Sequence, residues 1–283
     1  MSEEVASNLA TLRRLVFNPE VPLAQQRRRL SVASALARAS SLERRRDEIA
    51  GVAVERVVPP GVVASRRVLL VHGGGYCLGS PASVAGLSDA LALAWSAEVV
   101  AVDYRLAPEH PAPAARDDVA RVLAAGEWSV GVGDSAGAGA LSAAILAGAR
   151  APRVLALLSP WLDLTRDWLS EPGGDDDPVL SPGWLAWCAD AYAGAARDDP
   201  SVSPLLADWS GMPPAVVVTG GRDLLAPDAR TLGARVPQVR LVDVPSAWHG
   251  VALWVGRDAL ADAVVARVAA EVERALRASA TGW

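Results

Sequence analysis

Lysine is absent from this chain of 283 residues, so all 27 basic residues are arginines. This absence excludes the phosphate-binding loop that ends in Gly-Lys, the lysine Schiff base of pyridoxal phosphate enzymes and the Ser-x-x-Lys nucleophile pair. The formal net charge is −5, whereas a nucleic-acid-binding surface requires an excess of basic side chains. We therefore expect no nucleic-acid partner.

Histidine and cysteine are also scarce, with three and two residues. The sequence holds neither an HExxH motif nor a CxxC pair, so no metal site is expected. Cys77 and Cys188 lie far apart in the sequence and do not suggest a disulfide framework. A reduced, cytoplasmic protein is the expectation.

Long hydrophobic runs are missing as well. No segment of about 18 apolar residues occurs, so we expect no membrane span. The first residues are acidic and lack a continuous apolar stretch, which argues against a signal peptide. Apolar residues nevertheless make up 51% of the chain, enough for a large buried core.

After residue 50, short apolar runs alternate with alanine-rich stretches of helical character. The runs are 52–58, 67–71, 99–102, 129–132, 154–158, 215–219 and 240–244, and the intervening stretches include 83–94, 114–125, 138–150, 228–235 and 258–277. Strands that alternate with helices are typical of a mainly parallel sheet with helices on both faces. The sequence therefore predicts the α/β fold class.

Two segments fall outside this alternation. Residues 1–50 are predicted to be helical, with the arginine clusters 27–29 and 44–46 on solvated helix faces. Residues 163–212 contain no strand-like run and are predicted to be an insertion that is partly helical from about Pro182. Insertions of this length are usually lids or binding elements.

A Gly-x-Ser-x-Gly motif, GDSAG at 133–137, stands between an apolar run and an alanine-rich helix. In this context the motif predicts a nucleophile elbow, a turn so tight that its flanking positions must be glycine. The turn presents the Ser135 hydroxyl above the sheet and close to a helix N-terminus, where developing negative charge is favoured. The alternative is a glycine-rich turn with Ser135 as a helix cap.

A second motif, His72-Gly-Gly-Gly, follows the run 67–71. A glycine-rich loop at this place can turn backbone N–H groups toward the space above Ser135, where acyl transfer needs donors for an oxyanion. A phosphate-binding loop is the alternative, but lysine is absent and no helix begins directly after the glycines.

A serine nucleophile needs a base and an orienting carboxylate. In α/β-hydrolases the chain order is Ser, acid, His, so His249 fits as the base and His110, which precedes Ser135, does not. The loop after the run 215–219 offers Asp223 and Asp228. Asp223 is preferred because it lies closer to the strand end, but Asp228 stays open as an alternative.

Taken together, these motifs resemble the hormone-sensitive-lipase-like esterases, also called the alpha/beta hydrolase fold-3 group. The resemblance covers most of the chain from about residue 52 to residue 249. It depends on HGGGY at 72–76, DYRLAPEHPAPAARDD at 103–118, GDSAG at 133–137, SPWLDL at 159–164, DPVLSP at 177–182, GRD at 221–223 and HG at 249–250.

The resemblance implies an α/β-hydrolase fold with a small helical cap, built from an N-terminal arm (1–50) and the insertion (about 163–212) on a catalytic domain (51–283). It implies a serine hydrolase that cleaves small carboxylic esters of short acyl chain, needs no cofactor and often forms a homodimer. The roles that it implies are nucleophile, base and acid for Ser135, His249 and Asp223, and oxyanion-hole N–H donors in Gly73, Gly74 and Ala136.

Ten tryptophans against one phenylalanine and three tyrosines make an unusual aromatic balance. As a hypothesis, Tyr76, Trp184, Trp187 and Trp248 line a pocket for a small acyl or aryl group, because they lie in the predicted cap or beside motif loops. Ordinary core packing is the alternative for each of them.

Other reactions use the same triad. An amidase, a deacetylase or a lactone hydrolase of a specialised metabolite would carry the same residues, and a ligand-binding protein can keep the fold without catalysis. Activity should rise with pH through the pKa of a histidine base, near about 6–7 for an ordinary imidazole.

Overall fold

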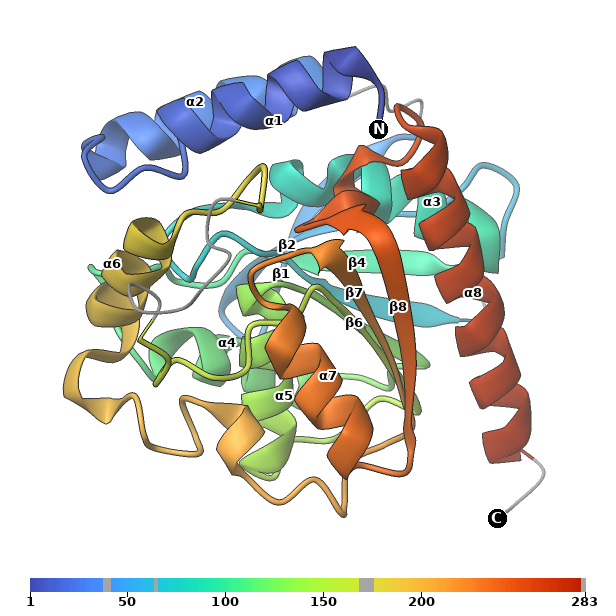
Figure 1. The fold of residues 1–283 in the computed structure, drawn as a ribbon. Coiled ribbons are helices and arrows are strands. Elements are labelled where there is room, and N and C mark those ends of the chain that lie inside the picture. The colour runs from blue at the N-terminus through green and yellow to red at the C-terminus, as the bar shows by residue number, and fades with distance from the viewer. Residues whose placement is uncertain (38–41, 64–65, 168–175, 281–283) are drawn as a thin grey trace.

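The structure, a computed structural model, describes residues 1–37, 42–63, 66–167 and 176–280. An eight-stranded sheet forms its centre, in the order β1-β2-β4-β3-β5-β6-β7-β8 (Figure 1). Neighbouring strands from β4 to β8 in this order are parallel. Strand β2 pairs antiparallel with β4, and β1 pairs antiparallel with β2. The strands are β1 (Arg44–Ile49), β2 (Val52–Val57), β3 (Arg67–Val71), β4 (Glu98–Val102), β5 (Val130–Asp134), β6 (Val154–Leu158), β7 (Ala215–Arg222) and β8 (Val239–Trp248).

Strand β1 corrects one expectation, because residues 44–49 were predicted to be helical. They form an edge strand that pairs with β2 along its whole length. Ala50 and Gly51, at φ 50° and 77°, make the two-residue turn between these strands. Charged side chains pair across the hairpin, with Arg44 3.0 Å from Glu55. On an edge strand such pairs replace the apolar alternation that identifies a strand in a sequence.

Helices cover both faces of the sheet, as the alternating pattern predicts (Figure 1). On one face α3 and α8 pack against each other, and α4, α5 and α7 cover the other. Their bounds are α3 (Ala85–Trp95), α4 (Ala114–Ala124), α5 (Ala136–Leu146), α7 (Ala226–Arg235) and α8 (Ala259–Ala280).

Helix α5 lies almost completely buried between the sheet and the rest of the protein. Its small residues permit this position: a Cβ at Gly137 would lie 2.2 Å from the Val71 carbonyl oxygen, and one at Gly139 2.1 Å from the Tyr76 hydroxyl. The glycines of the GAGA sequence at 137–140 therefore allow the helix to pack closely against the end of strand β3 and against Tyr76.

The N-terminal arm consists of two helices, α1 (Glu3–Leu15) and α2 (Leu23–Ala37). They lie side by side above the sheet (Figure 1). Arg27 anchors the arm: its guanidinium donates to the carbonyl oxygens of Cys77 and Ala107 and to the Glu109 carboxylate. The arm is thus tied to the loop that follows the HGGG motif.

The predicted insertion contributes helix α6 (Pro182–Ala193), which begins at the expected residue. Ser181 accepts the Trp184 N–H as its N-cap. Residues 168–175 of the insertion lie outside the described residues. Short 3-10 helices complete the fold, at Pro81–Val84, Gly194–Ala196, Pro204–Leu206 and Val251–Trp254.

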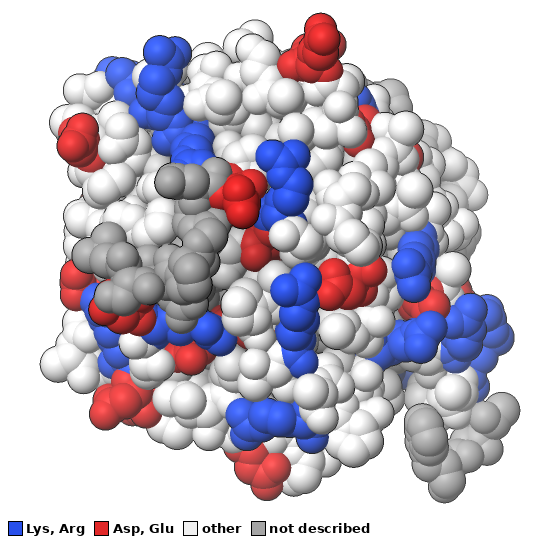
Figure 2. Space-filling model, in the orientation of Figure 1, with Lys and Arg blue, Asp and Glu red and all other residues white. Residues whose placement is uncertain are grey.

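The surface is mixed in charge. Figure 2 shows arginine side chains interleaved with aspartate and glutamate on the viewed face, in keeping with the net charge of −5. Within the described ranges, every helix is too short or too polar to cross a lipid bilayer.

Candidate active site

Ser135 occupies the sharp turn between β5 and α5, with φ 52° and ψ −120°. Positive φ is strained for a residue with a side chain, and such strain is found where a functional group must be held in place. Gly133 lets the turn close, because a Cβ there would lie 2.4 Å from the Ala138 Cα. The arrangement has the geometry of a nucleophile elbow.

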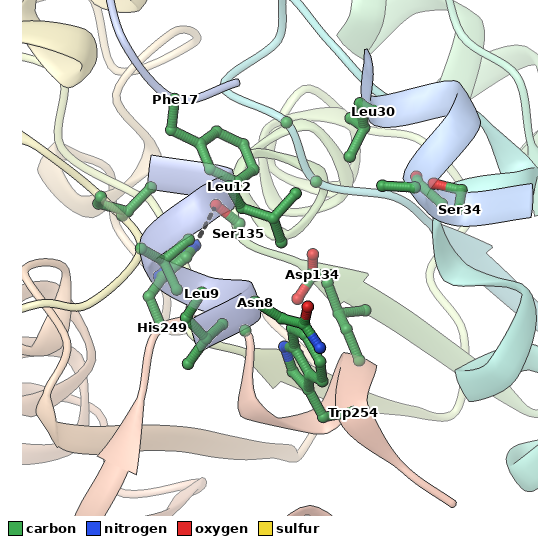
Figure 3. A pocket seen from close by; sticks show the side chains of 18 of the residues that line it. Asn8, Leu9, Leu12, Phe17, Leu30, Ser34, Asp134, Ser135, His249 and Trp254 are labelled. Carbon is green, nitrogen blue, oxygen red and sulfur yellow. Dashed lines mark hydrogen bonds between the residues drawn. The ribbon is translucent and has the colours of Figure 1, made fainter. Parts of the chain in front are cut away.

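His249 and Asp223 meet Ser135 at the carboxyl ends of the parallel strands. Figure 3 shows the His249 ring beside Ser135. His249 follows β8, and its Nε2 atom lies 3.1 Å from the Ser135 Oγ. Asp223 follows β7, and its Oδ1 atom lies 3.0 Å from the His249 Nδ1. All three side chains are buried. The structure thus brings together the three residues singled out from the sequence.

Asp228, the alternative acid, lies in the first turn of α7 and does not contact His249. Its buried carboxylate accepts the backbone N–H groups of Leu162 and Asp163 and pairs with the Arg166 Nε at 2.9 Å. Burial raises the pKa of Asp228 to about 7. This carboxylate therefore joins α7 to the segment after β6, and Asp223 alone is placed to orient the base.

The HGGG loop passes directly beside the elbow. A Cβ at Gly73 would lie 2.4 Å from an Asp134 carboxylate oxygen, and one at Gly74 2.3 Å from the Leu78 carbonyl oxygen. The Gly73 N–H lies on the Asp134 side of the loop and lowers the pKa of that carboxyl against the larger effect of burial. In the described part of the chain we find no acceptor for the N–H groups of Gly74, Gly75 and Ala136.

His72 fixes this loop rather than taking part in the triad. Its ring stacks on Tyr104 with centroids 4.3 Å apart, and its Nδ1 lies 2.8 Å from the Gly73 carbonyl oxygen. The Tyr104 hydroxyl donates to the His72 carbonyl. Burial lowers the pKa of His72 to about 4, so the imidazole stays neutral.

A cavity of about 330 Å³ opens above Ser135 (Figure 3). One side is formed by Ser135, His249 and the glycine loop. The other side is mostly apolar, with Asn8, Ser34 and Arg257 among its polar residues. The apolar side chains come from the arm (Leu9, Leu12, Phe17, Leu30), the segment before and within α6 (Val179, Leu180, Trp184) and the segment after His249 (Leu253, Trp254).

Of the four aromatic residues predicted to line the pocket, Trp184 alone is on its wall. Its indole N–H donates to Gln26 in α2, and its ring meets Phe17 edge to face. Tyr76 and Trp248 are buried in the core, and Trp187 packs half-buried against the core. The Tyr76 ring stacks on Tyr192 with centroids 3.8 Å apart, away from the cavity.

Trp254 and the wall that the arm supplies were not predicted from the sequence. A signal for the arm was present: Val5, Leu9, Leu12 and Val16 recur at helical spacing, which marks one face for burial. Leu9 and Leu12 on this face line the cavity. Trp254 stands five residues after the predicted base, and that proximity was its only signal.

Three carboxylates act on His249. Burial lowers its pKa, but Asp223, Asp177 and Asp134 outweigh burial and raise it to about 9. The pKa of Asp223 is lowered. Burial raises it, but the attraction of His249 and the hydrogen bonds to the carboxylate lower it by more. Burial raises the pKa of Asp134 to about 6.

Asp177, Asp223 and His249 also form the one group of metal-ligating types found close together among the described residues, with ligand atoms within 4.8 Å of one another. Hydrogen bonds engage the His249 Nδ1, the Asp223 Oδ1 and both Asp177 oxygens, while the Asp223 Oδ2 is buried without a partner among the described residues. His249 Nδ1 is bonded to Asp223, and Asp177 accepts three backbone N–H groups. The donor set is therefore that of a hydrogen-bonded triad rather than of a cation site.

Comparison with known proteins places this geometry in a family. Residues 68–253, which include the glycine loop, the elbow and His249, match the alpha/beta hydrolase fold family. The chain belongs to the alpha/beta hydrolase fold family. It is 34% identical over 280 residues to the "Putative acetyl-hydrolase LipR" of Mycobacterium tuberculosis, with 91% of each chain covered. It is 35% identical to the carboxylesterase NlhH of the same species, with 69% of this chain and 70% of that one covered.

Solved structures of the family agree. A hormone-sensitive lipase from a metagenome library superposes with a TM-score of 0.88 at 29% identity, covering 98% of this chain and 99% of that one. The expected fold, the expected membership of the hormone-sensitive-lipase-like esterases and the expected enzyme class, a carboxylic ester hydrolase, are confirmed by these comparisons.

Proposed function

We propose that this enzyme cleaves carboxylic esters of short acyl chain by forming an acyl-enzyme on Ser135. The observation that carries the proposal is the continuous hydrogen-bonded chain from the Ser135 Oγ through the His249 ring to Asp223, at 3.1 and 3.0 Å. The Ser135 end of this hydrogen-bonded series faces a cavity beside backbone N–H groups of the elbow and the glycine loop. Acyl transfer requires a nucleophile and N–H donors in this arrangement.

In the first half of the reaction, His249 takes the Ser135 proton while the Oγ attacks the ester carbonyl carbon. Asp223 keeps the Nδ1 proton in place and stabilises the imidazolium. His249 then donates its proton to the leaving alcohol. In the second half a water attacks the acyl-enzyme by the same route and releases the carboxylic acid.

The oxyanion would be held by backbone N–H groups of the elbow and the glycine loop. Ala136 supplies one, at the N-terminus of α5. Gly73 and Gly74, the two glycines predicted from the sequence, would supply the others, since both lie in the loop beside the elbow and line the cavity.

The volume of the cavity supports small substrates. At about 330 Å³ it stands at the lower end of the range of small-molecule sites, about 300–1,000 Å³. We expect kcat/KM for p-nitrophenyl esters, measured from acetate to dodecanoate, to be highest for short acyl chains. A maximum at decanoate or longer would contradict the short-chain assignment, and turnover of anilides or lactones alone would redirect the proposal to another acyl group.

Trp184 is expected to limit acyl length, because its ring lies against Gly75, where a Cβ would be 2.7 Å from it. Trp184→Phe should raise the ratio of kcat/KM for octanoate to that for acetate by about 10-fold, the lower end of the effect of one methylene group in an apolar pocket. Trp187→Phe is the matched control, since Trp187 packs against the core outside the cavity. Equal ratios in the two variants would remove Trp184 from the acyl site.

The activity should rise with pH through an alkaline transition. His249 must be neutral to accept the Ser135 proton, and the surrounding carboxylates raise its pKa to about 9. The protonated, inactive form therefore persists above the pH range of an ordinary imidazole, and kcat/KM should increase until the pH exceeds this pKa. A pH profile for p-nitrophenyl acetate, corrected for spontaneous hydrolysis, measures it; a transition at or below about pH 6.5, the value of an ordinary imidazole, would contradict the expectation.

A further inference from the structure

Asp177 is a buried carboxylate that the triad mechanism leaves without a role. It stands just before α6, in the predicted cap insertion, and only 1% of its surface is exposed. One carboxylate oxygen accepts the N–H groups of Val179 and Leu180 at 2.8 and 3.0 Å. The other accepts the Leu224 N–H at 2.9 Å. A cap residue is thus bonded to the residue that follows Asp223.

The same carboxylate lies beside the proposed base. One ligand atom each of Asp177, Asp223 and His249 lie within 4.8 Å of one another. Asp223 is hydrogen-bonded to the His249 Nδ1, and Asp177 is bonded to backbone amides instead. The imidazole therefore has two buried carboxylates close to it, one in contact and one held by the main chain.

We propose that Asp177 is a positioning residue for ester hydrolysis, which places a second fixed negative charge beside His249 and holds the loop that carries Asp223. The inference rests on the proposed function, because it concerns the imidazolium that forms when His249 takes the Ser135 proton.

The electrostatic part follows from this geometry. A cation that forms about 4–6 Å from a buried carboxylate is stabilised, and the stabilisation needs no rearrangement if the carboxylate is already held. Burial raises the pKa of Asp177, and His249 and the backbone N–H groups act in the opposite direction, toward the ionised form. Three such N–H groups hold the carboxylate in place. The other groups that face His249 are Asp223, Asp134 and the Ser135 hydroxyl.

The mechanical part connects three segments that are distant in sequence. The Arg13 guanidinium of α1 donates to the Asp177 carbonyl oxygen, while the Asp177 side chain reaches Leu224. The arm, the insertion and the loop carrying Asp223 thus meet at one residue. We infer that the contacts of the cap with Asp177 help to set the position of Asp223.

Asp177→Asn tests the inference, because it removes the charge and leaves an amide oxygen for Val179 and Leu180. The acid limb of the kcat/KM–pH profile should move to lower pH by about one unit, the effect of removing one carboxylate at this distance. Asp176→Asn is the matched control: the neighbouring carboxylate is exposed, and its loss should leave the limb in place. Asp177→Glu should restore the limb toward the wild-type position.

The His249 imidazole gives a readout that needs no turnover. The chain has only three histidines, so the His249 ring can be assigned by NMR with a His249→Gln variant and titrated directly. Its midpoint should fall by about one unit in Asp177→Asn and stay unchanged in Asp176→Asn. An unchanged midpoint and an unchanged limb in Asp177→Asn would overturn the inference and leave Asp177 a purely structural residue.

Two further measurements keep the outcomes separate. If Asp177→Asn does not fold, Asp177→Ser replaces it, since its hydroxyl is uncharged and can still accept the Val179 N–H. Labelling of Ser135 by a fluorophosphonate, with ester turnover of the wild type, tests the proposed function on its own. If Ser135 is labelled and the ester is turned over but the His249 midpoint is unchanged in Asp177→Asn, the role of Asp177 alone is refuted. If labelling and turnover are both absent, the proposed function is refuted.

Discussion

Replacing Ser135 by alanine should lower kcat for p-nitrophenyl acetate by at least about 10³-fold, because no other group can form the acyl-enzyme. The Ser135 Oγ is the atom that the His249 Nε2 contacts at 3.1 Å, and it lies at the floor of the cavity. The remaining rate would come from the oxyanion donors and from binding alone.

Ser142→Ala is the matched control for this substitution. Ser142 lies in the same helix, α5, is fully buried, and its hydroxyl has no hydrogen-bond partner among the described residues. Its removal should leave kcat within about twofold of the wild type. A fluorophosphonate should label the wild type and Ser142→Ala but not Ser135→Ala. A rate near that of the wild type in Ser135→Ala would refute the nucleophile assignment.

Asp223→Asn and Asp228→Asn should separate orientation of the base from stability of the fold. An amide at position 223 removes the charge beside the imidazolium and can hold His249 in the wrong tautomer, so kcat should fall by about 10⁴-fold. Circular dichroism and the unfolding midpoint of Asp223→Asn should stay close to the wild type.

Asp228→Asn should behave in the opposite way. One oxygen of its carboxylate accepts two backbone N–H groups and the other accepts from the Arg166 Nε. The amide of Asn keeps only one of these acceptors, and the loss of a buried hydrogen bond should lower the free energy of unfolding by about 1–3 kcal/mol. Urea unfolding followed by tryptophan fluorescence measures this loss, and kcat per folded molecule should remain within a few-fold of the wild type. A loss of kcat in Asp228→Asn without one in Asp223→Asn would identify Asp228 as the acid of the triad and Asp223 as the structural carboxylate.

The reasons for choosing Asp223 show how far the sequence can locate a catalytic residue. Side chains that follow parallel strands meet at one edge of a sheet, so the distance of Asp223 from the end of β7 was sufficient to place it beside His249. The strands of the parallel part were predictable for a related reason, because strands buried on both faces are continuous apolar runs.

Backbone donors and pocket walls were harder to predict. Three adjacent glycines follow His72, and the direction of each N–H depends on φ and ψ in the loop and on the nearby Asp134 carboxylate. The amino-acid sequence does not specify these angles. Tyr76 and Trp248 adjoin the motifs in sequence, but nearness in sequence does not fix where a side chain points: successive residues of a strand face opposite sides, and a loop follows no fixed pattern. Both side chains enter the core instead of the cavity.

The arm has a consequence for how such an enzyme diversifies. Its apolar face supplies one wall of the cavity from residues 8–36, while all three triad residues lie beyond residue 130. One part of the substrate-binding wall is therefore encoded apart from the catalytic residues. A single recombination near codon 42 can exchange that part, provided that the incoming arm retains arginines able to reach the carbonyls of Cys77, Ala107 and Asp177.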